Sequence, residues 1–277
     1  MQHLQWFPGH MTAAIRMMED NLKAVDGVML VLDARAPRAS INLKLEKLFA
    51  NKKVLYVLNK SDLIEVNDAK RTIKEFANEG RNAVSISAMD KKAVDLLYSK
   101  LFEMLKDKLE RNKLKGIFKP IRIMVVGIPN TGKSTIINAL CGGKKTVTGN
   151  KAGVTRGKQW VRLRELELLD TPGTMPPAFE NQTLAKHLAY IGSMNDSNID
   201  FDDLAYELIG ELKEKYPNLL KAKYDIENLD VETLEIFNAI CSRRGFIKKG
   251  GEYDYDRCAI AIIDDFRKGR IGKIILD

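Results

Sequence analysis

A glycine-rich segment with one lysine lies near the middle of the chain and has the composition of an anion-binding loop. Residues 127–134 read Gly-Ile-Pro-Asn-Thr-Gly-Lys-Ser, which matches the GxxxxGKS pattern of phosphate-binding loops. In such a loop the backbone N–H groups face phosphate oxygens at the N-terminus of a helix. Lys133 would neutralise those oxygens, and Ser134 would ligate magnesium. A simple glycine turn is the alternative, but a strand-like segment before the loop and a helical one after it favour phosphate binding.

The whole loop and the start of the following helix are therefore expected to contact the phosphates of a nucleotide. The predicted contacts are Pro129, Asn130, Thr131, Gly132, Lys133, Ser134 and Thr135. Lys133 is also a predicted catalytic residue, because its charge would lie against the β- and γ-phosphate oxygens.

A carboxylate follows a strand-like segment earlier in the chain. Residues 54–58 lead into Asn59-Lys60-Ser61-Asp62, which looks like the guanine-specific NKxD motif. Guanine presents two donors to one carboxylate, whereas adenine presents an acceptor at N1, so Asp62 would bind one base and repel the other. A matched polar edge of this kind can be worth roughly 10⁴-fold discrimination. Alone, these residues would more often form a turn that caps a helix, but their pairing with a phosphate loop favours base recognition by Asn59, Lys60 and Asp62.

A short companion motif follows the next strand-like segment. Ser87-Ala88 resembles the element whose backbone N–H contacts O6 of guanine. The dipeptide has almost no specificity by itself, and its assignment as a nucleotide contact depends on the neighbouring motifs.

A second carboxylate is predicted to lie near the phosphates. Residues 166–169 are strand-like and precede Asp170-Thr-Pro-Gly173, which resembles the DxxG element. Asp170 would hold magnesium through water, and the N–H of Gly173 would sense the γ-phosphate. Thr155, in a basic stretch that contains glycine, is the candidate catalytic and metal-binding threonine that closes over the site. The alternative is that Thr155 is only a turn or strand residue, as loop threonines usually are.

Strand-like and helical patterns alternate in the part of the chain that carries these motifs. This order predicts βαβ units and an α/β fold with a mostly parallel sheet. Asn67 and Asp90 are predicted helix N-caps, and Gly80 is a predicted helix stop. The predicted strands are 27–32, 54–58, 83–87, 121–126 and 166–169, and the predicted helices are 40–49, 69–77, 94–105 and 135–140, with residues 106–119 as a helix tail plus linker.

The remainder of the chain has a different pattern. Apolar residues recur at helical spacing in residues 201–212, 231–240 and 257–266, and these runs are broken by Pro217 and by Gly250 and Gly251. The sequence thus predicts a permuted nucleotide-binding domain over residues 1–180 and a small all-helical domain over residues 181–277.

Composition excludes several classes of protein. The chain has 277 residues, of which 45% are hydrophobic and 30% charged, so it has enough apolar material for a packed core and is neither disordered nor collagen-like. Its aliphatic runs are far shorter than the roughly 18 residues needed to cross a bilayer. The N-terminal residues resemble neither a secretory signal nor a transit peptide, which predicts a cytoplasmic protein without a membrane partner. The three cysteines and three histidines do not cluster, so neither a disulfide framework nor a zinc site is expected.

Positive charge is concentrated in the first part of the chain. Residues 1–180 contain 31 basic and 19 acidic residues, net +12, whereas the rest contains 14 and 18, net −4. Seven cations lie in residues 106–122 and seven more in residues 144–164. This density favours a polyanionic partner, although solvated helix ends and loops would have the same composition.

The order of the motifs is unusual. In Ras-like proteins the phosphate loop comes first and the guanine-reading motifs last, whereas here Asn59 to Asp62 and Ser87-Ala88 precede Gly127. The chain therefore looks circularly permuted, which is permissible when the original termini lie near each other at the surface. One consequence is that the segment after Asp170 runs directly into the helical part, so that hydrolysis could re-aim that part as a lever.

Together with this order, several further segments resemble the ribosome biogenesis GTPase A family over nearly the whole chain. They are Phe7-Pro-Gly-His10-Met11, Asp33-Ala-Arg35-Ala-Pro37, Arg243-Arg-Gly-Phe, Lys249-Gly-Gly and Asp265-Phe-Arg-Lys-Gly. The resemblance implies a GTPase that binds GTP or GDP and assists late assembly of the large (50S) ribosomal subunit. It also implies a helical C-terminal domain that contacts ribosomal RNA. We expect the protein to act as a monomer.

The resemblance also implies how the water is oriented. Ras-like enzymes use a glutamine just after DxxG, but here Thr174 stands there, and the family usually has an apolar residue at this position. The family implies that His10 orients the water, aided by a potassium ion near Asn130 that replaces an arginine finger. Neutral imidazole can accept a proton near pH 7. The alternative is that His10 merely caps the helix that starts near Thr12.

Three functions compete at this stage. The first is a GTP-hydrolysing switch on a pre-ribosomal particle. The second is a GTP-gated RNA-binding scaffold with incidental turnover, in which the basic linker and two C-terminal cation groups, Arg243 to Lys249 and Arg267 to Lys273, do the binding. The third is a P-loop ATPase or small-molecule kinase, which requires Asn59 to Asp62 to be coincidental.

Overall fold

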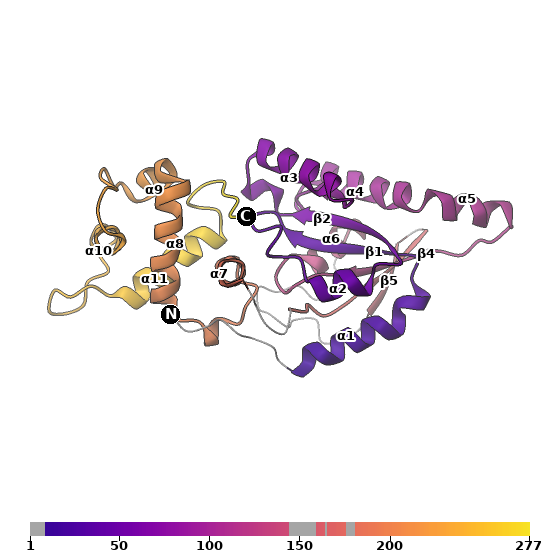
Figure 1. Ribbon diagram of the computed structural model, residues 1–277, viewed down its shortest axis with the longest axis horizontal. Coiled ribbons are helices and arrows are strands. Elements are labelled where there is room, and N and C mark those ends of the chain that lie inside the picture. The colour runs from indigo at the N-terminus through magenta and orange to yellow at the C-terminus, as the bar shows by residue number, and fades with distance from the viewer. Residues whose placement is uncertain (1–8, 144–158, 164, 176–180) are drawn as a thin grey trace.

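A six-stranded sheet flanked by helices forms one part of the molecule, and a group of helices forms the other (Figure 1). The computed structural model describes residues 9–143, 159–163, 165–175 and 181–277, and for Gly9 and His10 only the backbone. The strands are β1 (Gly27–Asp33), β2 (Lys53–Asn59), β3 (Asn82–Ser85), β4 (Ile121–Val126), β5 (Gln159–Leu163) and β6 (Leu166–Asp170). The α-helices are α1 (Gly9–Asn21), α2 (Leu43–Leu48), α3 (Val66–Asn78), α4 (Lys91–Met104), α5 (Lys106–Leu114), α6 (Lys133–Leu140), α7 (Gln182–Tyr190), α8 (Phe201–Lys215), α9 (Pro217–Tyr224), α10 (Thr233–Arg243) and α11 (Tyr255–Arg267).

The sheet has the order β3-β2-β1-β4-β6-β5, and every neighbouring pair is parallel except β5 with β6. The predicted mostly parallel α/β sheet is confirmed. Strand β4, which leads into the glycine-rich loop, lies at the centre, and β1 separates it from β2. All five parallel strands therefore present their carboxyl ends at the same edge of the sheet, where α/β proteins bind ligands.

Helices cover both faces of the sheet. Strand β1 is buried along its whole length, as expected for a central parallel strand that reads as one continuous apolar run. Its alternate side chains pack with helices α4 and α6 on one face and with α1, α2 and α3 on the other. The central strands are thus held from both sides, and their carboxyl ends are fixed relative to one another.

Several helix boundaries differ from the predicted ones. Asp90 caps α4 through a bond from Lys92 N–H, as predicted, and Gly80, with φ +75°, ends α3. The prediction that Asn67 caps α3 is wrong, because the helix begins at Val66 after Glu65, which makes no side-chain cap. The N-cap position is therefore two residues earlier than the predicted Asn67.

Two helices and one strand were not predicted. Pro217 was expected to break helical structure, but it begins α9, where its fixed φ and missing N–H are tolerated. Helix α7, capped by Asn181, and the short antiparallel edge strand β5 were also missed. Each is short, with eight, nine and five residues respectively.

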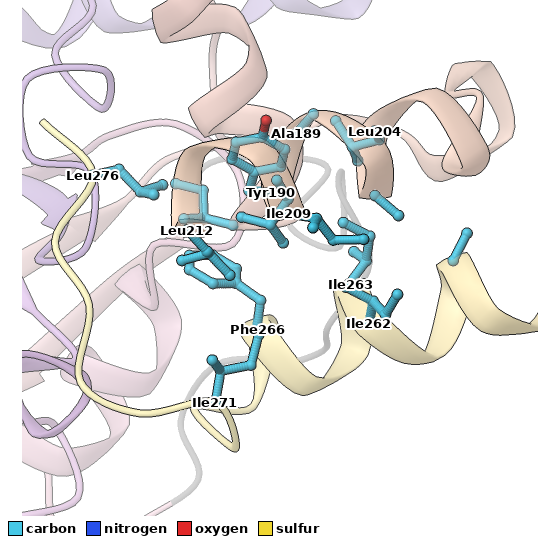
Figure 2. Packing of buried hydrophobic residues seen from close by; sticks show 14 of the residues in the cluster. Ala189, Tyr190, Leu204, Ile209, Leu212, Ile262, Ile263, Phe266, Ile271 and Leu276 are labelled. Atoms are coloured by element: carbon cyan, nitrogen blue, oxygen red, sulfur yellow. The ribbon is translucent and has the colours of Figure 1, made fainter. Parts of the chain in front are cut away.

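The helices after β6 pack around one apolar cluster (Figure 2). Tyr190 of α7 and Phe266 of α11 contact each other edge to face with ring centroids 6.2 Å apart. Figure 2 shows α8 and α11 contributing Leu212 and Ile263 to the same interior. The cluster also includes residues of the sheet side, namely Met11, Ala36, Ala39, Ile128 and Met175. The helical group is therefore packed against the end of the sheet that carries the motifs.

Within the described part of the chain, no helix has both the length and the apolar character needed to span a bilayer. All three cysteines are free, and no group of three or more potential metal-ligating His, Cys, Asp or Glu side chains occurs among the described residues.

Candidate functional site

The carboxyl ends of four parallel strands bring the predicted motifs together. Strand β1 ends at Asp33, which is in register with Asn59 at the end of β2. Asp170, at the end of β6, pairs in register with Val125 of β4, just before the glycine-rich loop. Segments more than 100 residues apart in sequence therefore meet at one edge.

The glycine-rich loop packs too closely against its neighbours for larger residues. Gly127 has φ +150°, and a Cβ there would lie 2.3 Å from the Val31 carbonyl oxygen. Gly132 has φ +91°, and a Cβ would lie 2.3 Å from Nδ2 of Asn59. Asn130 between them has a left-handed backbone at φ +60°. The loop thus needs glycine at both ends for the close contacts as well as for its conformation.

Lys133 is nearly buried at the start of α6. Its Nζ donates to the carbonyl oxygens of Gly127 at 3.2 Å and Ile128 at 2.8 Å. Burial lowers the pKa of Lys133 to about 8, against the opposing effect of the Asp170 carboxylate. The ammonium is therefore folded back against its own loop, in a place where the arrival of phosphate oxygens would stabilise its charge.

Asp170 lies beside Ser134, as a shared magnesium site requires. The Ser134 hydroxyl donates to Oδ2 of Asp170 at 3.2 Å, while Oδ1 is buried and has no hydrogen-bond partner among the described residues. Burial raises the pKa of Asp170 despite the nearby Lys133 charge. A buried carboxylate oxygen without a partner is costly, and a hydrated divalent cation would supply that partner.

The segment after Asp170 lies directly against the glycine-rich loop. A Cβ on Gly173 would lie 2.7 Å from the backbone nitrogen of Pro129, so glycine is required by packing. Thr174 donates its N–H to the Gly127 carbonyl and accepts from Nδ2 of Asn42. Its own hydroxyl is buried and has no hydrogen-bond partner among the described residues. This cost explains why an apolar side chain would suit the position better.

Asn59 links three parts of the site. Its Nδ2 donates to the carbonyl of Thr131 at 2.8 Å, and its Oδ1 accepts from the N–H of Ala88 at 3.1 Å. Only 2% of Asn59 is exposed. This asparagine therefore ties the glycine-rich loop to the Ser87-Ala88 turn and holds both in place.

Asp62 is exposed at the edge of the same site, in the short 3₁₀ turn Ser61–Leu63. Among the described residues, none forms an ion pair or hydrogen bond with its carboxylate, which is free to accept from a ligand. Ser87 is nearly buried and accepts from the N–H of Met89. The parallel pairing of β2 with β3 brings the segments of these residues side by side, since the N–H of Ser61 donates to the Ile86 carbonyl at 3.1 Å.

Lys60 takes part in a buried charge network that the sequence did not reveal. It has a left-handed backbone, φ +63°, and its Nζ donates to Oδ2 of Asp33 and to the Asn130 carbonyl, both at 2.7 Å. Burial lowers the pKa of Lys60 against the attraction of Asp33. Burial alone would raise the pKa of Asp33, but the charges of Arg35 and Lys60 outweigh it and hold that pKa well below its usual range.

Arg35 extends this network to the last helix. Its guanidinium pairs with both oxygens of Asp33, at 2.9 and 2.8 Å, and donates to the carbonyls of Phe266 and Arg267 at the end of α11. Only 2% of Arg35 is exposed. Asp33 and Arg35 were noted for their resemblance to a family motif, without a role. The only further sequence signal is a carboxylate at the end of an apolar strand, and its partner in α11 could not be read from the chain.

The glycine-rich loop also contacts the segment after α7. The Asn130 side chain donates to the Gly192 carbonyl, and the Ser193 hydroxyl donates to the Pro129 carbonyl at 2.8 Å. Thr131 is buried and donates to the Ile128 carbonyl within the loop. Two residues of the loop are thus in direct contact with the helical group.

Two predicted catalytic residues cannot be placed. Thr155 lies outside the described residues, as does the side chain of His10, whose backbone lies in the first turn of α1. The predicted start of that helix near Thr12 is three residues late. Both roles, and a potassium ion beside Asn130, stay predictions.

The C-terminal cations are less available than their number implies. Six of the eight predicted members of this patch face carboxylates: Arg243 with Asp225, Arg244 with Asp265, Arg267 with Asp196, Lys268 with Asp264, Arg270 with Asp264 and Asp265, and Lys273 with Glu65. The surface is therefore closer to neutral than the run of basic residues indicates.

Comparison with known proteins gives a consistent result. Residues 122–232 match the model of a family described as 50S ribosome-binding GTPase. The ribosome biogenesis GTPase A of Priestia megaterium is 38% identical over 277 residues, covering 99% of this chain and 96% of the relative. That of Thermotoga maritima is 29% identical over 274 residues, covering 98% and 93%.

Solved structures agree with the sequence relatives. A GDP-bound structure of YlqF has a TM-score of 0.68 and 25% identity, and the match covers 95% of this chain and 98% of that one. The GNP-bound YlqF from T. maritima has a TM-score of 0.64 and 26% identity, with coverage of 96% and 97%. The resemblance in fold therefore extends over both the sheet and the helices.

Proposed function

Because the chain belongs to the ribosome biogenesis GTPase A family, we propose that this GTP hydrolase assists late assembly of the large ribosomal subunit. The protein binds guanine nucleotide and hydrolyses GTP, as its GTPase domain and its relatives establish. In the proposal it acts as a monomer in the cytoplasm and binds the RNA of the subunit. The proposal also divides the chain into two units. Residues 1–180 bind the nucleotide, and residues 181–277 transmit its state to the ribosomal particle.

Asp62 would recognise the base, and the glycine-rich loop would hold the phosphates. The exposed Asp62 carboxylate accepts the two donors of guanine, and the N–H of Ala88, which donates to Oδ1 of Asn59, would turn to O6 of the base. Lys133 leaves the loop carbonyls and pairs with phosphate oxygens, which restores its ordinary protonation. The backbone N–H groups of residues 129–135 add donors at the N-terminus of α6.

Hydrolysis requires a positioned water and neutralised phosphate charge. Ser134 and Asp170 fit magnesium, because their oxygens are adjacent and Oδ1 of Asp170 lacks a partner. Magnesium, when bound, would neutralise charge on the β- and γ-phosphates. We assign the orientation of the water to His10 and the closure of the site to Thr155. A potassium ion held with Asn130 would supply the remaining positive charge.

The same contacts would transmit the state of the nucleotide. Gly173, which packs on Pro129, senses the γ-phosphate, and Pro129 accepts from Ser193 of the helical group. A shift of the segment 170–174 on hydrolysis would therefore move a contact between the loop and the helices. This is the physical basis on which GTP and GDP would bias attachment to the ribosomal particle.

The observation that carries the proposal is that Asn59 hydrogen-bonds both Thr131 and Ala88. These bonds support a single site formed by the proposed base-reading and phosphate-binding motifs. The test is co-sedimentation with purified large subunits in GDP and in a non-hydrolysable GTP analogue, together with GTP turnover with and without subunits. We expect binding to depend on the nucleotide and turnover to be strongly stimulated.

The variant His10→Ala distinguishes the hypothesis of a GTP-hydrolysing switch from that of an RNA-binding scaffold with incidental turnover. In this variant, GTP affinity and subunit binding should remain near wild type while the stimulated turnover is lost. Equal turnover of both proteins would remove His10 from the mechanism, and turnover that subunits do not stimulate would favour the RNA-binding scaffold.

A further inference from the structure

The segment that follows α5 carries an unusual exposed surface. We call residues 113–119 the α5–β4 tip. In this tip 95% of Phe118 and 88% of Leu114 are exposed, and Ile117 is 39% exposed. Phe118 is the most exposed large apolar residue in the described part of the chain. Large apolar side chains on a soluble protein are usually at least partly covered, and a cluster of them marks a binding surface.

The backbone of the tip has a defined, hydrogen-bonded conformation. Gly116, with φ +64°, ends α5, and its N–H donates to the Lys113 carbonyl while the Ile117 N–H donates to the Asn112 carbonyl. This pair of bonds is the Schellman arrangement that closes a helix. The turn therefore directs Leu114, Ile117 and Phe118 outward by its own hydrogen bonds, and no tertiary contact is needed to hold it.

Three lysines surround these apolar side chains. Lys113, Lys115 and Lys119 are exposed, and none of them forms an ion pair or side-chain hydrogen bond with a described residue. Other cations nearby are engaged, since Lys106 faces Glu110, Lys108 faces Asp26 and Arg122 faces Glu167. The charge of the tip is thus available to a ligand, unlike that of the C-terminal cation groups.

We propose that the α5–β4 tip binds unpaired RNA, with Phe118 stacking on a base and Lys113, Lys115 and Lys119 contacting phosphates. Exposed aromatic rings between cations are the device by which proteins hold single-stranded nucleic acid. Three apolar side chains are too few for the core of a stable protein interface, which buries about 800 Å² on each partner. The inference rests on the proposed function, because the RNA would be that of the large subunit.

The position of the tip gives the contact a structural consequence. Figure 1 shows α5 and the segment after it at the end of the molecule opposite to α9, α10 and α11. RNA bound at the tip would therefore lie far from any RNA bound by the helical group. The protein would touch two separate RNA segments and fix its orientation on the particle.

The test uses the full-length protein and a fluorescein-labelled 12-nucleotide single-stranded RNA of mixed sequence, with a duplex of the same length as comparison. Phe118→Ser should weaken binding of the single strand about tenfold, whereas Phe118→Trp should retain it. Lys113→Glu with Lys119→Glu should reduce the slope of log affinity against log salt by about 1.4. Equal affinity of Phe118→Ser and wild type for the single strand would overturn the proposal.

Matched control variants distinguish RNA binding at the tip from a general effect of surface charge or exposed apolar side chains. Lys70→Glu with Lys74→Glu makes the same charge change on α3, and Leu96→Ser removes another exposed apolar side chain, on α4. Both should bind RNA much as wild type does. If the α3 variant weakens RNA binding as much as the tip variant, a diffuse electrostatic effect replaces the proposed site.

A crosslinking experiment identifies the molecule that the tip contacts on the ribosomal subunit. A photoreactive phenylalanine analogue at position 118 should form adducts with RNA when the protein is irradiated on purified large subunits. Adducts only to protein would overturn the RNA assignment. If wild-type protein does not co-sediment with subunits in any nucleotide state, the proposed function fails. If it co-sediments but Phe118→Ser binds as tightly and position 118 yields no RNA adduct, only the tip assignment fails.

Discussion

Asp62 and Lys133 lie in opposite environments, and the chemistry expected of each follows from that difference. Asp62 is exposed and keeps its carboxylate free for a ligand, whereas Lys133 is almost buried and already occupied by carbonyl oxygens of its own loop. A ligand therefore gains a direct bond at Asp62 but must draw Lys133 away from existing partners.

Asp62→Asn should exchange base preference. The amide presents a donor where guanine also presents one, so GTP affinity should fall by about 1.5–3 kcal/mol, roughly 10- to 100-fold. Xanthosine triphosphate, which has an acceptor at that edge, should bind more tightly than GTP. Competition against a fluorescent GDP measures both, with Asp95→Asn on α4 as the control. An unchanged preference for GTP would contradict base reading by Asp62.

Binding of nucleotide should take up protons near pH 8. The pKa of Lys133 is lowered to about 8 in the free site, so the neutral form grows as pH rises through that value, and phosphate oxygens favour the charged form. At pH 8 we expect uptake of about half a proton per GDP, because the group is half protonated there. Calorimetry in two buffers of different ionisation enthalpy measures it. Lys133→Arg, which stays charged, should remove the buffer dependence, and a buffer-independent heat for wild type would refute the idea.

At the scale of elements, a buried ion pair joins the end of β1 to the end of α11. Arg35 satisfies both oxygens of Asp33 and two carbonyls of α11. Such a pair adds less stability than its distances suggest, because both charges were desolvated to form it. Removal of Arg35 is different, since it leaves the buried Asp33 carboxylate with Lys60 as its remaining described counter-charge and Oδ1 without the guanidinium.

Arg35→Gln should therefore lower the free energy of unfolding by about 3–5 kcal/mol. The matched control is Arg38→Gln, because Arg38 is 41% exposed and its guanidinium pairs with Glu75 and Glu79 at the surface; its loss should cost about 0–1 kcal/mol. Urea denaturation of both variants gives the comparison. Similar midpoints for the two variants would show that the buried network is not a structural clamp.

Across the whole molecule, the nucleotide site and the helical group are continuous. Asn130 and Pro129 of the glycine-rich loop hydrogen-bond the segment after α7. Lys60 donates both to this loop, at the Asn130 carbonyl, and to Asp33, which in turn pairs with Arg35. A ligand that orders the loop should therefore also order residues that it never touches.

GDP should slow amide hydrogen exchange in residues 188–193 and in the C-terminal turn of α11, as well as in the loop itself. Hydrogen-exchange mass spectrometry with and without GDP measures the effect. In Arg35→Gln the protection in α11 should decrease while that in the loop is kept. Protection confined to residues before Leu166 would show that the two parts are not coupled.

Much of the fold could be predicted because local pattern and tertiary packing agree there. The parallel strands are buried on both faces, so their apolar runs are continuous, and β4 was predicted residue for residue. Predictions failed where one residue has two uses. Pro217 breaks one helix and begins the next. Strand β5 is a five-residue edge strand in which only Val161 is buried, so it lacks the continuous apolar run of the central strands.

The sequence by itself determined which chemistry to expect: a glycine-rich loop with Lys133, a carboxylate at Asp62 that we propose reads the base, and their reversed order along the chain. These are local patterns, and each follows from the residue types that a phosphate or a purine edge requires. Only the tertiary structure decided that Asp33, Arg35 and α11 share one buried network, that the C-terminal cations are largely neutralised, and that Phe118 is left uncovered. Charge pairing and burial depend on residues far apart in the sequence, and no local pattern records which of them come into contact.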